Sequence, residues 1–106
     1  MNLANVELIR MKASAAKACA LMKVLANPDR LMILCQLAQG EHRVGELEEL
    51  LGVMQPTLSQ QLTVLRDEAL VTTRRDGKNI YYALGSPQSL AVINVLYQQF
   101  CDPNKE

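Results

Sequence analysis

Leucines spaced three and four residues apart predict two short helices in the middle of the chain, within residues 44–67. Gly52 lies between the two leucine groups and allows the tight turn that a helix-turn-helix requires. Pro56 is expected in the first turn of the second helix, where its missing N–H does no harm. The apolar faces expected to pack together are formed by Leu47, Leu50 and Leu51, and by Leu58, Leu62 and Leu65.

The second helix presents a polar face without charge, because no charged residue occurs between Met54 and Leu65. Helix faces that only meet water usually carry charged side chains. Gln can bond two atoms of an adenine edge, and Ser or Thr can donate or accept. We therefore expect this face to enter the major groove of DNA; a plain polar surface helix is the alternative. The expected base contacts are Gln55, Thr57, Ser59 and Gln60, with Gln61 nearer the edge.

Two β-rich runs at 71–75 and 80–84 predict a hairpin, since the segment between them begins with Asp-Gly. The hairpin gathers basic residues beside the helix-turn-helix, where they can bind phosphates or reach the minor groove. An ordinary solubilising loop is the alternative. The hairpin at 71–84 is therefore predicted to be a wing, with Arg74, Arg75 and Lys78 as its DNA contacts.

Apolar periodicity predicts three further helices. One covers residues 5–25, and an Asn-Pro-Asp start predicts a core helix at about 28–39, closed by Gly40. A Ser-Pro start predicts a last helix, which with the residue after it covers 87–101. The predicted fold is one domain over residues 1–106, mainly α (α+β), a winged helix-turn-helix with the order α-α-α-α-β-β-α.

The last helix is apolar around so much of its surface that a single copy of the chain would leave it poorly covered. The helix at 5–25 has an apolar stripe of its own. A homodimer through the first and last helices is the economical solution, because one patch then serves both subunits. Two reading helices about 34 Å apart could enter successive major grooves of a pseudo-palindromic operator in double-stranded DNA.

The overall charge and hydropathy narrow the class of protein. The net charge of +0 at pH 7 argues against a protein that coats nucleic acid without specificity. No segment approaches the roughly 20 apolar residues that span a membrane, and residues 1–10 lack the apolar region of a signal peptide. We expect a soluble cytoplasmic protein with no membrane partner and no cofactor.

The chain contains 3 cysteines and 1 histidine. Cys19, Cys35 and Cys101 are too few and too scattered for a disulfide scaffold, and each is by default a small buried hydrophobe. Without a CxxC pair or a catalytic base, a thiol oxidoreductase is disfavoured, and we expect no enzyme. His42 has no partner at ligand spacing and is expected in a surface loop.

Three segments carry a family resemblance that covers roughly residues 23–82. They read KVLANPDRLMILCQL, GELEELLGVMQPTLSQQLTVLRDEALV and RRDGKNIYYAL. In these segments the chain resembles the ArsR/SmtB family of bacterial repressors. The resemblance implies a dimeric winged-helix repressor that leaves DNA when an inducer binds. Met54 departs from the family, whose members commonly have Ser there to cap the recognition helix.

The same resemblance directs attention to the inducer, which in this family is often a metal. The stretch RVGEL at 43–47 lacks the expected thiolates, and SPQSLAVINVLYQQF contains no His, Asp or Glu. A metal- or metalloid-responsive repressor therefore stays the alternative, with no metal ligand assigned.

Cys35 and Cys101 instead resemble the dithiol of the sulfide-responsive, biofilm growth-associated branch of the family. That branch implies bridging of the two thiols by reactive sulfur or oxidant, followed by release of operator DNA. Cys19 is interpreted as structural.

Overall fold

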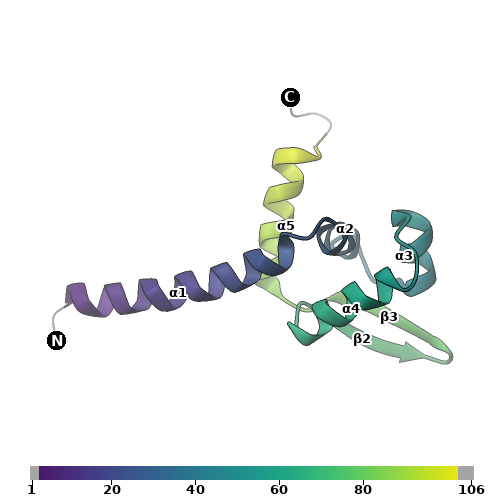
Figure 1. The fold of residues 1–106 in the computed structure, drawn as a ribbon, viewed down its shortest axis with the longest axis horizontal. Coiled ribbons are helices and arrows are strands. Elements are labelled where there is room, and N and C mark those ends of the chain that lie inside the picture. The colour runs from purple at the N-terminus through teal and green to yellow at the C-terminus, as the bar shows by residue number, and fades with distance from the viewer. Residues whose placement is uncertain (1–2, 103–106) are drawn as a thin grey trace.

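The computed structural model describes the backbone of residues 3–102 and the side chains of residues 5–102. Its mainly helical winged helix-turn-helix architecture confirms the predicted fold class (Figure 1). The elements are α1 (Leu3–Leu25), α2 (Pro28–Leu37), β1 (His42–Arg43), α3 (Val44–Leu51), α4 (Thr57–Asp67), β2 (Val71–Asp76), β3 (Asn79–Leu84) and α5 (Pro87–Phe100).

The predicted element order lacked one strand, β1, which makes the observed order α-α-β-α-α-β-β-α. His42 and Arg43 pair antiparallel with Tyr82 and Tyr81, so the sheet has the order β1-β3-β2. A strand of two residues shows no alternating pattern that could reveal it in a sequence. It exists because the neighbouring edge of β3 offers backbone groups to pair with.

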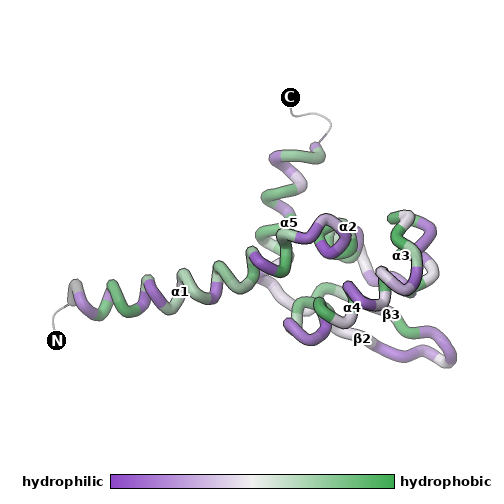
Figure 2. The backbone as a smooth tube through the Cα atoms, viewed as in Figure 1, coloured by the Kyte–Doolittle hydropathy of each residue, from purple (hydrophilic) through white to green (hydrophobic). Residues whose placement is uncertain are grey.

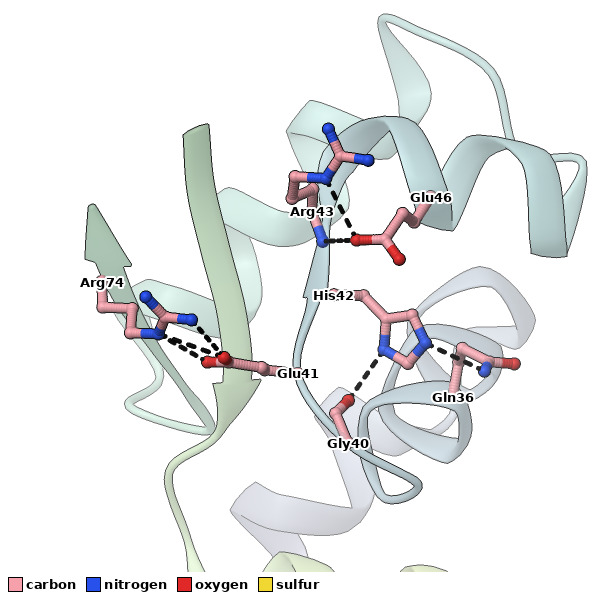
Figure 3. A network of polar contacts seen from close by, with 7 residues as sticks. All are labelled: Gln36, Gly40, Glu41, His42, Arg43, Glu46 and Arg74. Atoms are coloured by element: carbon pink, nitrogen blue, oxygen red, sulfur yellow. Dashed lines mark hydrogen bonds and ion pairs between the residues drawn. The ribbon is translucent and has the colours of Figure 1, made fainter. Parts of the chain in front are cut away.

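His42 is correspondingly not the loop residue that was expected. Its ring is half-buried, with Nδ1 2.7 Å from the Gly40 carbonyl oxygen and Nε2 3.3 Å from Gln36 Nε2 (Figure 3). The histidine therefore links the start of the sheet to α2.

The hairpin of β2 and β3 is longer than predicted by one residue on each strand. Its register runs from the pair Val71 and Leu84 to the pair Asp76 and Asn79, leaving Gly77 and Lys78 as the turn. Gly77 has φ +63°, in the left-handed region that two-residue hairpin turns use and that glycine adopts without strain.

The hydrophobic core forms around α2, which contacts α1, α3, α4, α5 and β3. The fully buried side chains of this core include those of Ile33, Leu34, Leu47, Leu58, Leu65 and Ile93. The predicted leucine face of α4 is confirmed, because Leu62 is buried as well. The predicted face of α3 is partly wrong, because Leu50 is 56% exposed. On this short helix Leu47 occupies the position against the core, and Leu51 is half-buried at its edge.

Two helix ends also differ from the predictions. Helix α2 ends at Leu37 and continues as a turn, in which the N–H groups of Gln39 and Gly40 donate to Gln36 and Leu37. Pro56 precedes α4 as its N-cap residue instead of lying in its first turn, and its carbonyl oxygen accepts from Gln60 N. Both changes move a boundary by one or two residues and leave the core unchanged.

Helix α1 projects from the body over most of its length (Figure 1). The radius of gyration, 16.4 Å, therefore exceeds the roughly 13 Å of a compact domain of this size. Apolar residues occur along the projecting part as well as near the core (Figure 2). Among residues 3–102, no helix is long and apolar enough to cross a membrane.

The packing around Leu65 gives a stability prediction. Leu65→Ala should lower the free energy of unfolding by about 2–5 kcal/mol, because it removes a fully buried side chain and leaves a cavity. Urea unfolding followed by circular dichroism measures the change. The matched control is Leu50→Ala on the exposed side of α3, and an equal loss in both variants would contradict the described core.

Candidate nucleic-acid interface and thiol pair

The open face of α4 lies opposite its buried leucines. Helical spacing places Gln60 and Thr63 on the side away from Leu58, Leu62 and Leu65, and both are exposed. Thr57 is half-buried on one flank. Gln60 has no hydrogen bond to another of the described side chains, so its amide is available to a ligand.

The start of α4 is ordered by its own polar side chains. Gln55 Oε1 accepts hydrogen bonds from Ser59 N at 3.1 Å and from Ser59 Oγ. Thr63 Oγ1 donates to the carbonyl oxygen of Ser59 at 2.9 Å. Because the first N–H groups of a helix lack helical partners, Gln55 acts as a side-chain cap. Two of the predicted base contacts, Gln55 and Ser59, therefore hold each other in place.

Gln61 occupies a different environment from Gln60. Its side chain is half-buried on the flank of α4 that faces α2, and Oε1 accepts a hydrogen bond from Arg30 Nη1 at 3.0 Å. Arg30 was not among the residues predicted from the sequence. The sequence did contain a signal for Arg30. The residue lies three positions after the N-cap Asn27, so it belongs to the first turn of α2, which lies near the end of α1.

The wing does not present its three cations equally. Consecutive strand residues point to opposite faces, so Arg74 and Arg75 diverge. Arg74 Nε donates to both carboxylate oxygens of Glu41 at 3.1 and 2.9 Å (Figure 3). The Arg74 guanidinium also lies 4.3 Å from the centre of the Tyr81 ring. Within the described chain, Arg75 and Lys78 form no ion pair and are exposed.

Two carboxylates near the wing are held in the charged form by arginine. The hydrogen bond from Arg74 lowers the pKa of Glu41. The hydrogen bond from the Arg43 backbone N–H, 3.0 Å long, lowers the pKa of Glu46 and ties the start of α3 (Figure 3). Glu41 was not identified as a site residue, because its partner lies on the other side of β3.

Cys35 and Cys101 belong to neighbouring elements of the same chain. Cys35 is half-buried on α2 and lines an open cavity of about 300 Å³ with Ala38, Gln39, Ile93, Asn94 and Tyr97. Cys101 is exposed directly after α5, and its N–H donates to the Tyr97 carbonyl oxygen at 2.8 Å. Both are free thiols.

Cys101 acts electrostatically on Cys35. Burial raises the pKa of Cys35, and the charge of a nearby Cys101 thiolate raises that pKa further. The predicted default of a buried cysteine is wrong for Cys101, and also for Cys19, which is exposed on α1 in the single chain. Within residues 3–102, no three His, Cys, Asp or Glu side chains are grouped so that they could hold a metal ion.

Comparison with known proteins gives consistent similarities. Residues 27–73 match the family model described as "Bacterial regulatory protein, arsR family". The chain is 46% identical to the biofilm growth-associated repressor of Agrobacterium fabrum over 105 residues, which is 99% of this chain and 90% of that protein.

Two solved structures are similar over most of their length. The transcriptional repressor BigR from Xylella fastidiosa has a TM-score of 0.82 at 45% identity, covering 92% of this chain and 96% of that chain. Reduced HlyU from Vibrio cholerae has a TM-score of 0.83 at 41% identity, covering 87% and 97%.

The environment of Cys35 predicts its reactivity. Because its pKa is raised in the folded chain, alkylation by iodoacetamide should reach half its maximal rate at a higher pH in the native protein than in urea. Peptide mass mapping separates Cys35 from the other cysteines. Cys101→Ser should lower the pH at which Cys35 of the native protein reacts at half its maximal rate, because it removes the charge of Cys101, the smaller of the two causes of the raised pKa. A native midpoint at or below that of the unfolded chain would contradict the described site.

Proposed function

This chain belongs to the arsR family of bacterial regulatory proteins, and we propose that it is a dimeric repressor whose Cys35–Cys101 dithiol controls DNA binding. Its relatives are transcriptional regulators, not enzymes. The observation that carries the proposal is the position of both thiols: Cys35 lies on α2, Cys101 directly follows α5, and these two helices contact each other within one chain. The open face of α4 and the wing provide the DNA contacts, and α1 and α5 provide the dimer interface.

Exposed apolar side chains on α1 and α5 support the dimer. Phe100 is 82% exposed, and Ile9 lies on the projecting part of α1, where it is 59% exposed. A chain that stayed single would leave both helices poorly covered in water. A two-fold dimer covers the same patch on each copy. Among the described side chains of these helices, the large exposed hydrophobics are Leu8, Ile9, Met11, Met22, Leu90, Val95, Tyr97 and Phe100.

DNA reading is assigned to the uncharged face of α4. Gln60 lies at the centre of that face and can bond the N6 and N7 atoms of adenine together. Thr57, Ser59 and Gln55 surround it near the start of the helix, the part that meets base edges in helix-turn-helix complexes. Arg75 and Lys78 would contact phosphates or the minor groove, and Arg74 would join them from the other face of the wing.

The trigger is a two-electron oxidation of the thiol pair. The Cys101 thiolate, which is exposed, takes a sulfane sulfur from a persulfide donor, so that a Cys101 persulfide forms and the donor leaves as a thiolate. Cys35 then loses its thiol proton to solvent, attacks Cys101 Sγ and expels hydrosulfide. Overall, the two thiols become a disulfide and the sulfane sulfur is reduced to sulfide. One of the similar structures is that of reduced HlyU, a name that specifies a redox state of that protein.

The bridge would act on DNA binding by changing how α5 sits against α2. Helix α5 belongs to the proposed dimer interface, whereas α2 packs against α4. Two reading helices must match the spacing of successive grooves, so a small shift at the interface is enough to weaken binding. The bridged form must favour the weakly binding geometry, since otherwise oxidation would change nothing.

The base-reading and phosphate roles predict different mutational effects. Gln60→Ala should weaken binding to a selected operator by roughly 5- to 100-fold and leave binding to random duplex nearly unchanged. Arg75→Ala should weaken binding to both duplexes and reduce the slope of the logarithm of the binding constant against the logarithm of the salt concentration by about 1. Fluorescence anisotropy across a salt series measures both. Equal losses on operator and random duplex for Gln60→Ala would contradict base reading.

The dithiol predicts which variants lose the response. Cys35→Ser and Cys101→Ser should bind the operator but stay bound after addition of polysulfide, whereas Cys19→Ser should be released like the unaltered protein. Gel shifts with and without reductant measure release, and mass spectrometry identifies the bridge. Release of the Cys35→Ser/Cys101→Ser double variant by polysulfide would remove the dithiol from the mechanism.

A further inference from the structure

Arg30 connects three helices through one guanidinium group. It lies in the first turn of α2, where its side chain is half-buried. Its Nε donates to the Val24 carbonyl oxygen at 2.7 Å and Nη2 to the Lys23 carbonyl oxygen at 3.4 Å, both in the last turn of α1. Nη1 donates to Gln61 Oε1 on α4 at 3.0 Å.

The chemistry of this contact suits arginine. The last carbonyl groups of a helix have no partner within the helix and carry partial negative charge, which a cation stabilises. The planar guanidinium can satisfy them from one edge and still donate to a third acceptor. A lysine ammonium is a compact charge that lacks this fixed fork.

The contact to Gln61 gives α4 a directional constraint that its leucines do not supply. Leu58, Leu62 and Leu65 hold α4 by apolar burial, which is not directional. A hydrogen bond depends on distance and angle, so it resists rotation of the helix about its axis. Rotation would swing Gln60, the neighbour of Gln61, away from the centre of the open face.

We propose that Arg30 is a positioning residue that fixes the rotation of α4 against the end of α1, and that Gln61 serves this link instead of reading bases. The proposal rests on the proposed function, because it concerns the accuracy of DNA reading. It also gives a direct connection from the dimerisation helix to the reading helix, since α1 would set where the partner subunit lies.

Two roles for Gln61 can be separated by a change of charge. Gln61→Glu keeps an oxygen acceptor for Arg30 and turns the contact into an ion pair. If Gln61 touched a base, the same change would place a negative charge that DNA phosphates repel and would remove the amide donor. Gln60→Glu is the matched control on the adjacent residue, where no Arg30 contact exists.

The experiment measures the affinity of each variant for a duplex selected from a random pool and for random duplex. Gln61→Glu should keep the ratio of the two affinities within about threefold, whereas Gln61→Met and Arg30→Met should each lower it roughly tenfold. The Arg30→Met/Gln61→Met double variant should be no worse than either single variant. Gln60→Glu should abolish selectivity.

Several outcomes would overturn the positioning role. One is a loss of selectivity in Gln61→Glu as large as the loss in Gln60→Glu. Another is a double variant in which the losses of selectivity caused by Arg30→Met and Gln61→Met multiply. Arg30→Lys supplies a gentler change should Arg30→Met fail to fold; it should keep the thermal midpoint and still lose selectivity, and full retention of selectivity would contradict the role of the fork. Failure of the unaltered chain to select any sequence would instead overturn the proposed function.

Discussion

Burial of α2 is the constraint on which the rest of the structure depends. Ile33 and Leu34 on this helix are completely shielded from water, and the helix touches α1, α3, α4, α5 and the sheet. Such a helix cannot shift alone, because close-packed side chains transmit displacement to their neighbours. Two side chains of α2 therefore link it to elements that matter for function. Arg30 joins it to α1 and α4, and Cys35 places a thiol beside α5.

Side-chain hydrogen bonds then set the surfaces that the core only brings together. Gln55 caps α4, Glu46 ties the start of α3, and Glu41 holds Arg74 on the wing. These contacts order the surface before any ligand arrives, which reduces the entropy that binding must overcome. Gln60, Arg75 and Lys78 form none of these contacts. The surface therefore combines side chains that are already ordered with a few that are available to bind DNA.

The sequence predicted the helices and the hairpin because leucine spacing, Asn-Pro, Asp-Gly and Ser-Pro signals act locally. It missed β1, because strand pairing with Tyr81 and Tyr82 depends on residues distant in the chain. The same reason explains which parts of the candidate site could be predicted. Gln60 could be placed from helical spacing, but the partners of Gln61 and Arg74 could not, because they are distant in the chain. Leu50 shows the limit of periodicity, which does not say how much of a short helix the core covers.

The central claim, that bridging Cys35 to Cys101 changes the spacing of the reading helices, can be measured directly in the dimer. A nitroxide introduced through a non-natural amino acid at Asp67, exposed at the end of α4, reports the distance between the two copies by pulsed electron paramagnetic resonance. We expect this distance to change by roughly 2 Å or more when polysulfide closes the bridge. Distance distributions that coincide before and after complete bridging, verified by mass spectrometry, would contradict the claim.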